Sequence, residues 1–164
     1  MSQFTHLDAA GRVRMVDVTE KAPTVRSATA EGFVRCSEPV LTALRDQAVP
    51  KGDVFALARI AGIAGAKKCA ELLPLAHIIG VHGAVVDVAL EEEGVRITAT
   101  VRTADRTGVE MEALTAVSIA ALAVVDMVKG LDKSVTIEQV ALLEKTGGKS
   151  GVWRREDAVG GASS

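Results

Sequence analysis

The most apolar part of this chain is AVSIAALAVVDMV, residues 116–128, in which one serine and Asp126 are the only polar members. Upstream, Thr107 and Glu110 have the T-x-x-E spacing of a capping box, which predicts that a helix begins there. Gly130 suits the left-handed residue that ends many helices. A helix that is apolar nearly all round is typical of a domain core, and thirteen residues are too few to cross a bilayer, which takes about 20. We therefore expect the chain to fold around a buried helix.

The charge of Asp126 within this helix needs an explanation, because taking a carboxylate out of water is costly unless a partner offsets the loss. Lys129 follows three residues later, on the same helical face, and could be that partner. One interpretation is a structural ion pair at a subunit contact. The other is a catalytic acid or base whose pKa is shifted by burial.

Composition favours one well-packed domain and argues against a nucleic-acid partner. A chain of 164 residues is long enough for one core and leaves little for a second. Only three Phe and one Trp are aromatic, so few side chains could stack on bases. The net charge of −2 supplies no basic field for a phosphate backbone. An apolar content of 48% also suggests that some surface is buried between subunits.

Neither a targeting signal nor a cysteine motif stands out. The N-terminal MSQFTHLDAAGRVRM lacks the apolar core of a signal peptide, so we expect a cytoplasmic protein. Cys36 and Cys69 show no C-x-x-C spacing and no disulfide context. Both are expected to be small core residues.

Four segments have the patterns of strands. Residues 24–36 are β-tending, and residues 80–90 are rich in valine. In residues 95–102, apolar and polar side chains alternate strictly, which is the cleanest strand signal in the chain. A turn at residues 91–94 joins these last two segments into a predicted hairpin. The final strand is expected at residues 134–145.

Two helices precede the hairpin. Ser37, followed by Pro39, predicts the start of a short helix that ends near Gln47. Asp53 is the expected N-cap of a longer helix that runs to Leu73 and is stopped by the following proline.

The predicted order is β-α-β-β-α-β, with the short helix as an addition, and this is the pattern of ferredoxin-like α+β folds. We expect a single domain over residues 1–164, with a four-stranded antiparallel sheet and both long helices on one face. An oligomer partner is the expected cover for the other face. Residues 1–22 and 146–164 are expected to be flexible.

Two polar positions near helix ends could bind a ligand. Lys51 and Asp53 flank a glycine at a helix start, where free amides and a cation suit a phosphate, although such a lysine is more often simply solvated. His77 follows an apolar run, and a histidine there is more often a hydrogen-bonded core residue than a catalyst. His82 is the nearest second histidine and no acid or cysteine completes a metal-ligand spacing with the two, so no zinc site is expected.

Two acids lie at the start of the apolar helix. The capping box accounts for Glu110, but Glu112 needs a separate role. Asp126 follows Glu112 by 14 positions, which on one helix is about 21 Å. The two carboxylates therefore cannot contact one small reacting centre within a chain. If both are functional, the site is composite, formed across a subunit interface around an elongated ligand.

Several blocks of this sequence resemble one family. KGDVFALARIAGIAGAKK, ELLPLAH, TGVEMEALTAVSIAAL, DMVK and KTGGKSG are similar to blocks of the MoaC family, the cyclic pyranopterin monophosphate synthases of molybdenum cofactor biosynthesis. The resemblance runs from about residue 3 to Gly151. It implies a ferredoxin-like fold and a hexamer, built as a trimer of dimers with active sites at dimer interfaces.

The resemblance also implies a lyase reaction on a small triphosphate. The substrate would be 3′,8-cyclo-7,8-dihydroguanosine 5′-triphosphate, supplied by a radical SAM GTP cyclase as the functional partner. The enzyme would rearrange the purine to a pterin, close a cyclic phosphate and release diphosphate. No resident cofactor or metal is expected, although Mg²⁺ could accompany the triphosphate or diphosphate.

Matching the motifs position by position gives the site residues that the resemblance implies. Asp126 and Lys129 correspond to the catalytic aspartate and the lysine one turn later. The implied substrate-binding residues are Leu75, Ala76 and His77, then Met111 and Glu112, with Lys51, Lys67, Lys145 and Lys149 as cations for the triphosphate.

One departure from the family pattern affects the histidine. Where the family commonly reads P-L-C-H-P, this chain has Ala76 before His77 and Ile78 after it. Loss of the proline frees the backbone that orients the histidine. The alternative function is therefore a non-catalytic or weakly active paralogue that binds a pterin or a nucleotide phosphate.

Overall fold

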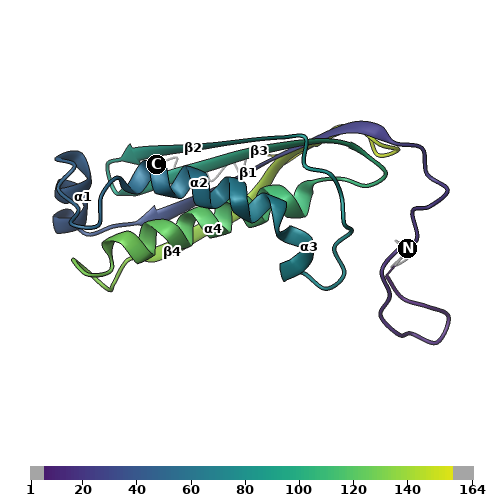
Figure 1. Cartoon of the computed structure of the whole chain (residues 1–164), viewed down its shortest axis with the longest axis horizontal. Helices are drawn as coiled ribbons and strands as arrows, with labels where there is room; N and C mark the ends of the chain where they lie inside the picture. The colour runs from purple at the N-terminus through teal and green to yellow at the C-terminus, as the bar shows by residue number, and fades with distance from the viewer. Residues whose placement is uncertain (1–5, 157–164) are drawn as a thin grey trace, which may run out of the picture.

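The computed structural model describes residues 6–156, which form an α+β structure with two long helices along one face of a sheet (Figure 1). The elements are β1 (Thr24–Arg35), α1 (Glu38–Arg45), α2 (Val54–Lys67), α3 (Cys69–Leu72), β2 (Gly83–Glu91), β3 (Gly94–Asp105), α4 (Glu110–Val128), β4 (Thr136–Thr146) and β5 (Trp153–Arg154). The four predicted long strands and the predicted hairpin between β2 and β3 are thus confirmed, with boundaries shifted by a few residues.

All strands of the sheet are antiparallel, in the order β2-β3-β1-β4-β5. The prediction of four strands is wrong by one, because β5 pairs with β4 through Trp153 and Lys145. Gly147, Gly148 and Gly151 all have positive φ, a conformation that glycine adopts without steric cost. They turn the chain back onto β4, in a segment whose glycine content predicted flexibility.

The core lies between the sheet and the two long helices. The side chains of Val95, Ile97, Ala99 and Val101 are fully buried, so the alternation in β3 faces the helices as predicted. Gly62 of α2 allows close packing of α2 on α4, since a Cβ there would lie 3.0 Å from the Ala116 carbonyl oxygen. Small residues at this crossing explain why the core can be so poor in aromatic side chains.

The apolar helix forms, but its ends differ from the prediction. Its N-cap is Val109, without a side-chain capping bond, so the capping box at Thr107 does not form. The Glu110 carboxylate instead lies 3.4 Å from the Lys145 ammonium of β4. Gly130 does not have a positive φ, so it is not the left-handed residue that was expected. The helix ends at Val128, and the amide of the C-cap Lys129 donates to the Val125 carbonyl oxygen at 2.8 Å.

The helix that begins after Asp53, α2, also differs from the prediction. Asp53 caps it as predicted, because its carboxylate accepts a hydrogen bond from the Ala56 amide at 3.0 Å. The helix breaks at Lys68, whose φ of −104° and ψ of 7° are not helical, and it does not run to Leu73 as one element. The break turns Cys69 inward, where its side chain is almost completely buried.

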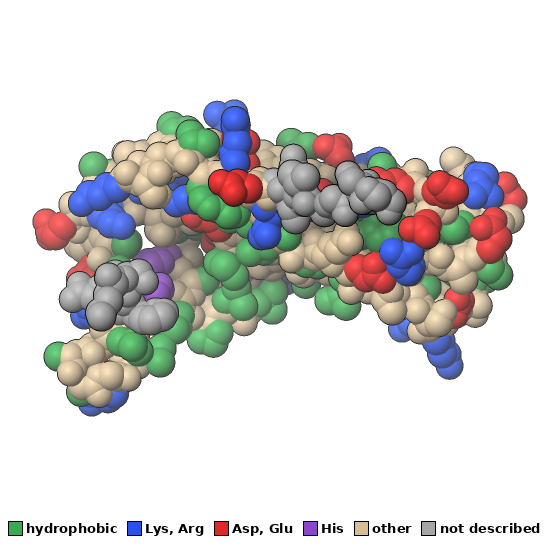
Figure 2. All heavy atoms as spheres, turned by 180° about the vertical axis from the view of Figure 1, so that it is seen from behind, with side chains coloured by type: hydrophobic (Ala, Val, Ile, Leu, Met, Phe, Trp, Pro, Cys, Tyr) green, Lys and Arg blue, Asp and Glu red, His purple; other side chains and the backbone are tan. Residues whose placement is uncertain are grey.

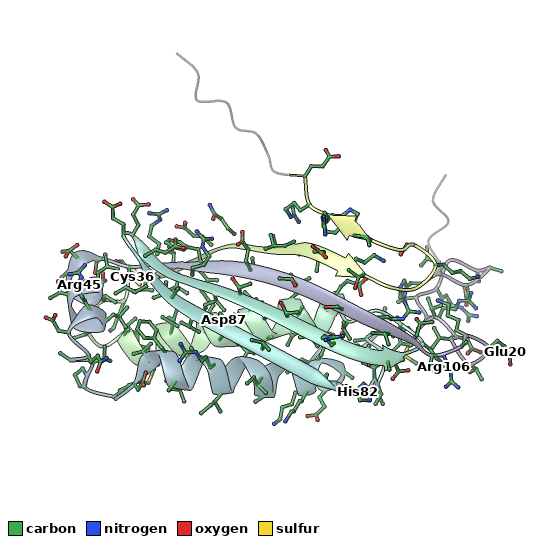
Figure 3. All side chains as sticks on the ribbon, turned by 90° about the horizontal axis from the view of Figure 1, so that it is seen from above. Glu20, Cys36, Arg45, His82, Asp87 and Arg106 are labelled. Carbon is green, nitrogen blue, oxygen red and sulfur yellow. The ribbon has the colours of Figure 1, made fainter. Side chains whose placement is uncertain are left out.

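One face of the sheet has no helix over it among residues 6–156. Figure 3 shows the strands lying over the helices, with Asp87 on the open face. Val25 and Val85 are exposed. A second copy of the chain as the cover for this face stays a prediction.

By length and composition alone, α4 would pass as a membrane-spanning helix, and it is the one such helix among the residues described. In this structure it packs against α2, β1 and β3, and half of its most apolar window is buried. A core helix of an ordinary domain has the same properties.

The hairpin makes a prediction about stability. A Cβ at Gly94 would lie against the Val34 carbonyl oxygen and the Phe33 ring, so Gly94→Ala is expected to lower the free energy of unfolding by about 1–3 kcal/mol. Gly130→Ala is the matched control, because nothing lies within 4 Å of a Cβ there. Urea denaturation measures both, and equal stabilities for the two variants would contradict the packing argument.

Candidate functional site

The first group of predicted site residues meets at the C-terminal end of α4. The Lys129 ammonium lies 2.7 Å from one carboxylate oxygen of Asp126, and the Lys51 ammonium lies 3.5 Å from the other. Lys51 also donates to the Asp126 backbone carbonyl at 2.7 Å. We call Lys51, Asp126 and Lys129 the α4 C-terminal triad.

The prediction that Asp126 is buried is wrong. Its side chain is 58% exposed, and it follows Leu122 by one turn on a helix face that is open in the single chain. The Lys129 ammonium, aided by Lys51, lowers the pKa of the Asp126 carboxyl. The lysine partners, and not burial, are therefore the main influence on the pKa of this carboxyl.

The second group lies at the other end of the same helix. Leu75, Ala76 and His77 line a cavity of about 420 Å³ together with Met111 and Glu112. The N-terminal segment closes one side of this cavity through Val16 and Val18, among others. Figure 2 shows histidine side chains at the hollow between that segment and the body of the molecule. The two predicted substrate-contacting stretches are thus brought together, and we call this space the α4 N-terminal cavity.

Glu112 is the buried acid of the site. Only 4% of its surface is exposed, and this burial raises the pKa of its carboxyl, although its own backbone and the nearby Cys69 oppose the rise. The charge of Glu110 raises the pKa further, while His77 lowers it. A raised pKa keeps more of a carboxyl protonated at a given pH, which suits Glu112 to donate a proton.

His77 is held by the N-terminal segment. Its Nε2 lies 2.6 Å from the Val16 carbonyl oxygen, which can only accept a hydrogen bond, so Nε2 carries a proton in this arrangement. The ring therefore has an anchor beyond its own backbone. This contact restrains the histidine in a chain that has Ile78 in place of a proline.

A larger cavity of about 720 Å³ lies beside the α4 N-terminal cavity and shares Lys21, Thr107, Gly108 and Glu110 with it. Four basic side chains line it: Lys21, Arg26, Lys145 and Lys149. Lys145 also donates to the Ser150 hydroxyl at 2.5 Å. We call this space the basic cavity, and its cations could bind phosphates.

The fourth predicted cation, Lys67, lies on another side of the buried acid. It lines a cavity of about 240 Å³ with Cys69, His77 and Glu112. Lys67, Lys145 and Lys149 thus lie around the N-terminal end of α4. Lys51 belongs to the C-terminal triad instead.

Sequence reasoning missed several residues of the site. Lys21 and Arg26 line the basic cavity, and the only signal for them was the family-like character of the N-terminal stretch. Cys69 was expected to be plain core, yet it lines a cavity together with Glu112. The Val16 contact is made by backbone, for which the sequence has no signal.

Residues 6–156 contain no group of three histidine, cysteine or acidic side chains placed to hold a metal ion. Glu112 and Asp126 lie on one continuous helix, so their separation of about 21 Å holds within the chain. The two groups of site residues do not meet in a single copy.

Comparison with known proteins shows the family of this chain. The model of the MoaC family matches residues 15–148. The chain belongs to the MoaC family. The matched range includes every predicted site residue of this family member except Lys149.

Curated relatives cover nearly the whole chain. A protein from Streptomyces coelicolor is 56% identical over 153 residues, 93% of this chain and 90% of the relative. One from Geotalea uraniireducens is 53% identical, covering 94% and 98%, and one from Thermomicrobium roseum is 51% identical, covering 96% of each. All three are named cyclic pyranopterin monophosphate synthase.

Proposed function

We propose that this chain is a cyclic pyranopterin monophosphate synthase of molybdenum cofactor biosynthesis, a lyase. The observation that carries the proposal is identity of 51–56% with curated synthases over more than nine-tenths of the chain. The substrate would be the cyclised dihydro-GTP triphosphate, and the products cyclic pyranopterin monophosphate and diphosphate. A radical SAM enzyme that cyclises GTP would supply the substrate, in the cytoplasm.

The active site of this proposal is composite. The α4 C-terminal triad of one copy would complete the α4 N-terminal cavity of another, since about 21 Å separates the two within a chain. The exposed helix face that carries Leu122 and Asp126 supports a subunit contact there. A hexamer of three such dimers is the proposed assembly, and the order β2-β3-β1-β4 supports a ferredoxin-like core with β5 added at its edge.

The two carboxyl groups would have different tasks. Asp126 stays charged because the neighbouring lysines lower its pKa, so it suits a base or a stabiliser of positive charge. Glu112 suits proton donation, because burial raises its pKa. Paired carboxyl groups with opposite pKa shifts are a common basis for such a division of acid and base roles.

The basic side chains would bind the triphosphate and stabilise the charge that develops on the leaving diphosphate. Lys145 and Lys149 line the basic cavity, which opens beside Glu110. Lys51 of the partner copy would add a further positive charge beside the triphosphate. Mg²⁺ bound to the triphosphate would enter with the substrate and needs no site of its own.

Removing single phosphate-binding cations tests this assignment. Lys51→Ala and Lys67→Ala are each expected to weaken substrate binding by about 1.5–3 kcal/mol, the usual strength of a charge-assisted contact. The loss should be much smaller for an analogue without the β- and γ-phosphates. Lys68→Ala is the matched control, because Lys68 is exposed and lines none of the cavities described above. Calorimetric titration that gives parental affinity for both variants would contradict the assignment.

A non-catalytic or weakly active paralogue that binds a pterin or nucleotide phosphate is the second candidate. Ala76 and Ile78 favour it, and Ile78 is 93% exposed beside the histidine. The bond between His77 and Val16 favours the enzyme, because it keeps the ring in place. Purified protein mixed with the cyclised triphosphate decides between them, since the enzyme releases diphosphate, whereas the paralogue binds the triphosphate with little or no release.

A further inference from the structure

The segment that carries His77 has no regular structure of its own. It joins α3 to β2, and residues 73–82 belong to no helix or strand. Ile78, directly after the histidine, is 93% exposed, so its side chain does not fix the backbone there by packing. Ile79 and Val81 pack in part against the core. The remaining restraint on this segment comes from hydrogen bonds further along the chain.

Several of these hydrogen bonds tie the end of the segment to the end of β3. The Thr103 hydroxyl donates to the Gly80 carbonyl oxygen at 2.5 Å. The Gly80 amide donates to the Asp105 carboxylate at 3.3 Å. Two residues later, the His82 amide donates to the Arg102 carbonyl oxygen at 3.0 Å. Both polar groups of the Gly80 backbone are therefore bound by side chains of β3.

The ring of His82 adds a further bond to the same strand. The Ala104 amide donates to its Nδ1 at 3.1 Å, so this nitrogen carries no proton and acts as an acceptor. The ring also lies against Gly80, where an added Cβ would be 3.1 Å from ring carbon Cε1. Figure 3 shows His82 and Arg106 at the same end of the sheet, where β3 leads into α4.

Thr103 is unusual among the core-facing residues of β3. It follows the buried Val101 by two positions, and only 2% of it is exposed. A buried hydroxyl is costly unless it is hydrogen-bonded, and the Gly80 carbonyl supplies the partner here. Valine would fill the same position without that cost. Packing alone therefore does not explain the hydroxyl, whereas attachment of the His77 segment does.

We propose that Thr103, aided by His82, is a positioning residue that holds Gly80 and so fixes the backbone that presents His77 to the α4 N-terminal cavity. The histidine then has two restraints, which are the Val16 carbonyl at its ring and β3 three residues downstream. The consequence for substrate binding rests on the proposed function. The effect on the His77 ring does not.

The direct test measures how fast the Nε2 proton of His77 exchanges with water, by NMR, with the signal assigned by its loss in His77→Ala. Thr103→Val keeps the size of the side chain but removes the donor. Exchange is expected to become about three- to tenfold faster, as for the loss of one hydrogen bond. Thr103→Ser keeps the donor and should restore slow exchange.

A second variant tests the same attachment at an exposed position. His82→Phe removes the acceptor of the Ala104 amide while keeping a ring, and His82 is exposed, so the fold should be retained. Exchange at His77 is expected to become faster, by less than in Thr103→Val. If Thr103→Val does not fold, His82→Phe decides the question, and parental exchange in it overturns the proposal.

Thr100→Val is the matched control. Thr100 lies on the same strand, and its hydroxyl is 2.9 Å from that of Thr29, so the variant also removes a hydroxyl that is hydrogen-bonded. It should leave exchange at His77 unchanged. Parental exchange in a folded Thr103→Val variant, or no restoration by Thr103→Ser, overturns the proposal. Thermal unfolding verifies that each variant is folded.

A double-mutant cycle tests the consequence for the site. By calorimetric titration with the cyclised triphosphate, Thr103→Val is expected to raise Kd about three- to tenfold. In the His77→Ala background it should have little further effect, because both changes act through one side chain. Equal losses in the two backgrounds would mean a purely structural role and overturn the proposal. If the parent protein neither binds the triphosphate nor releases diphosphate, the proposed function fails, while proton exchange still decides the role of Thr103.

Discussion

Replacing Asp126 with asparagine is expected to lower turnover by about 100-fold or more while the oligomer stays intact. The substitution nearly preserves shape but removes the charge that Lys129 and Lys51 hold at 2.7 and 3.5 Å. Loss of a group that transfers a proton in the transition state typically costs about 10²–10⁴ in rate. Diphosphate release under saturating substrate measures the effect, and light scattering verifies the assembly.

Asp87→Asn is the control for this substitution, because it makes the same chemical change at an exposed acid on the open face of the sheet. It should retain near-parental turnover. If Asp126→Asn also retains near-parental turnover in an intact oligomer, the catalytic role is lost and the structural ion pair with Lys129 explains the residue.

The second large effect is recovery of activity from two inactive variants. Glu112→Gln and Asp126→Asn should each have little activity alone, yet a mixture under conditions of subunit exchange should regain part of it. The reason is geometric, because about 21 Å of helix separates the two residues in one chain. A composite site draws each from a different copy, so a mixed dimer holds one intact site and one with both lesions.

If the chains mix at random in equal amounts, roughly a quarter of the sites are intact, since a two-fold interface forms two sites, each with Glu112 from one copy and Asp126 from the other. The control mixes Glu112→Gln with the double variant, which can form no intact site. Verified mixed oligomers without any recovery would mean that the site lies within one chain or that Glu112 is not functional. In the second case, its place in the first turn of α4, where acids favour the helix dipole, explains it.

The regular elements were largely predictable because their signals are local. The alternation at residues 95–102 depends only on which side chains follow one another, and it places Ile97 and Val101 in the core. Asp53 caps its helix through a contact only three residues away. The stretches 75–77 and 111–112, implied by the family resemblance, do line one cavity.

Several failed predictions concern contacts with other segments of the chain. A pairing with Lys145 takes Glu110 out of the expected capping box. Pairing of Trp153 with Lys145 adds a strand where composition indicated flexibility. The break at Lys68 accompanies the burial of Cys69 against α4, which no pattern within residues 53–73 indicates.

Asp126 and Glu112 separate what the sequence determines from what only the tertiary structure determines. The sequence alone determined that both acids are on one apolar helix and too far apart to act together within a chain, because helix geometry depends only on residue number. Only the tertiary structure decided which acid is buried, because burial depends on the helix face that packs against the sheet and α2. That packing leaves Asp126 exposed between two lysines and buries Glu112, so their pKa values shift in opposite directions.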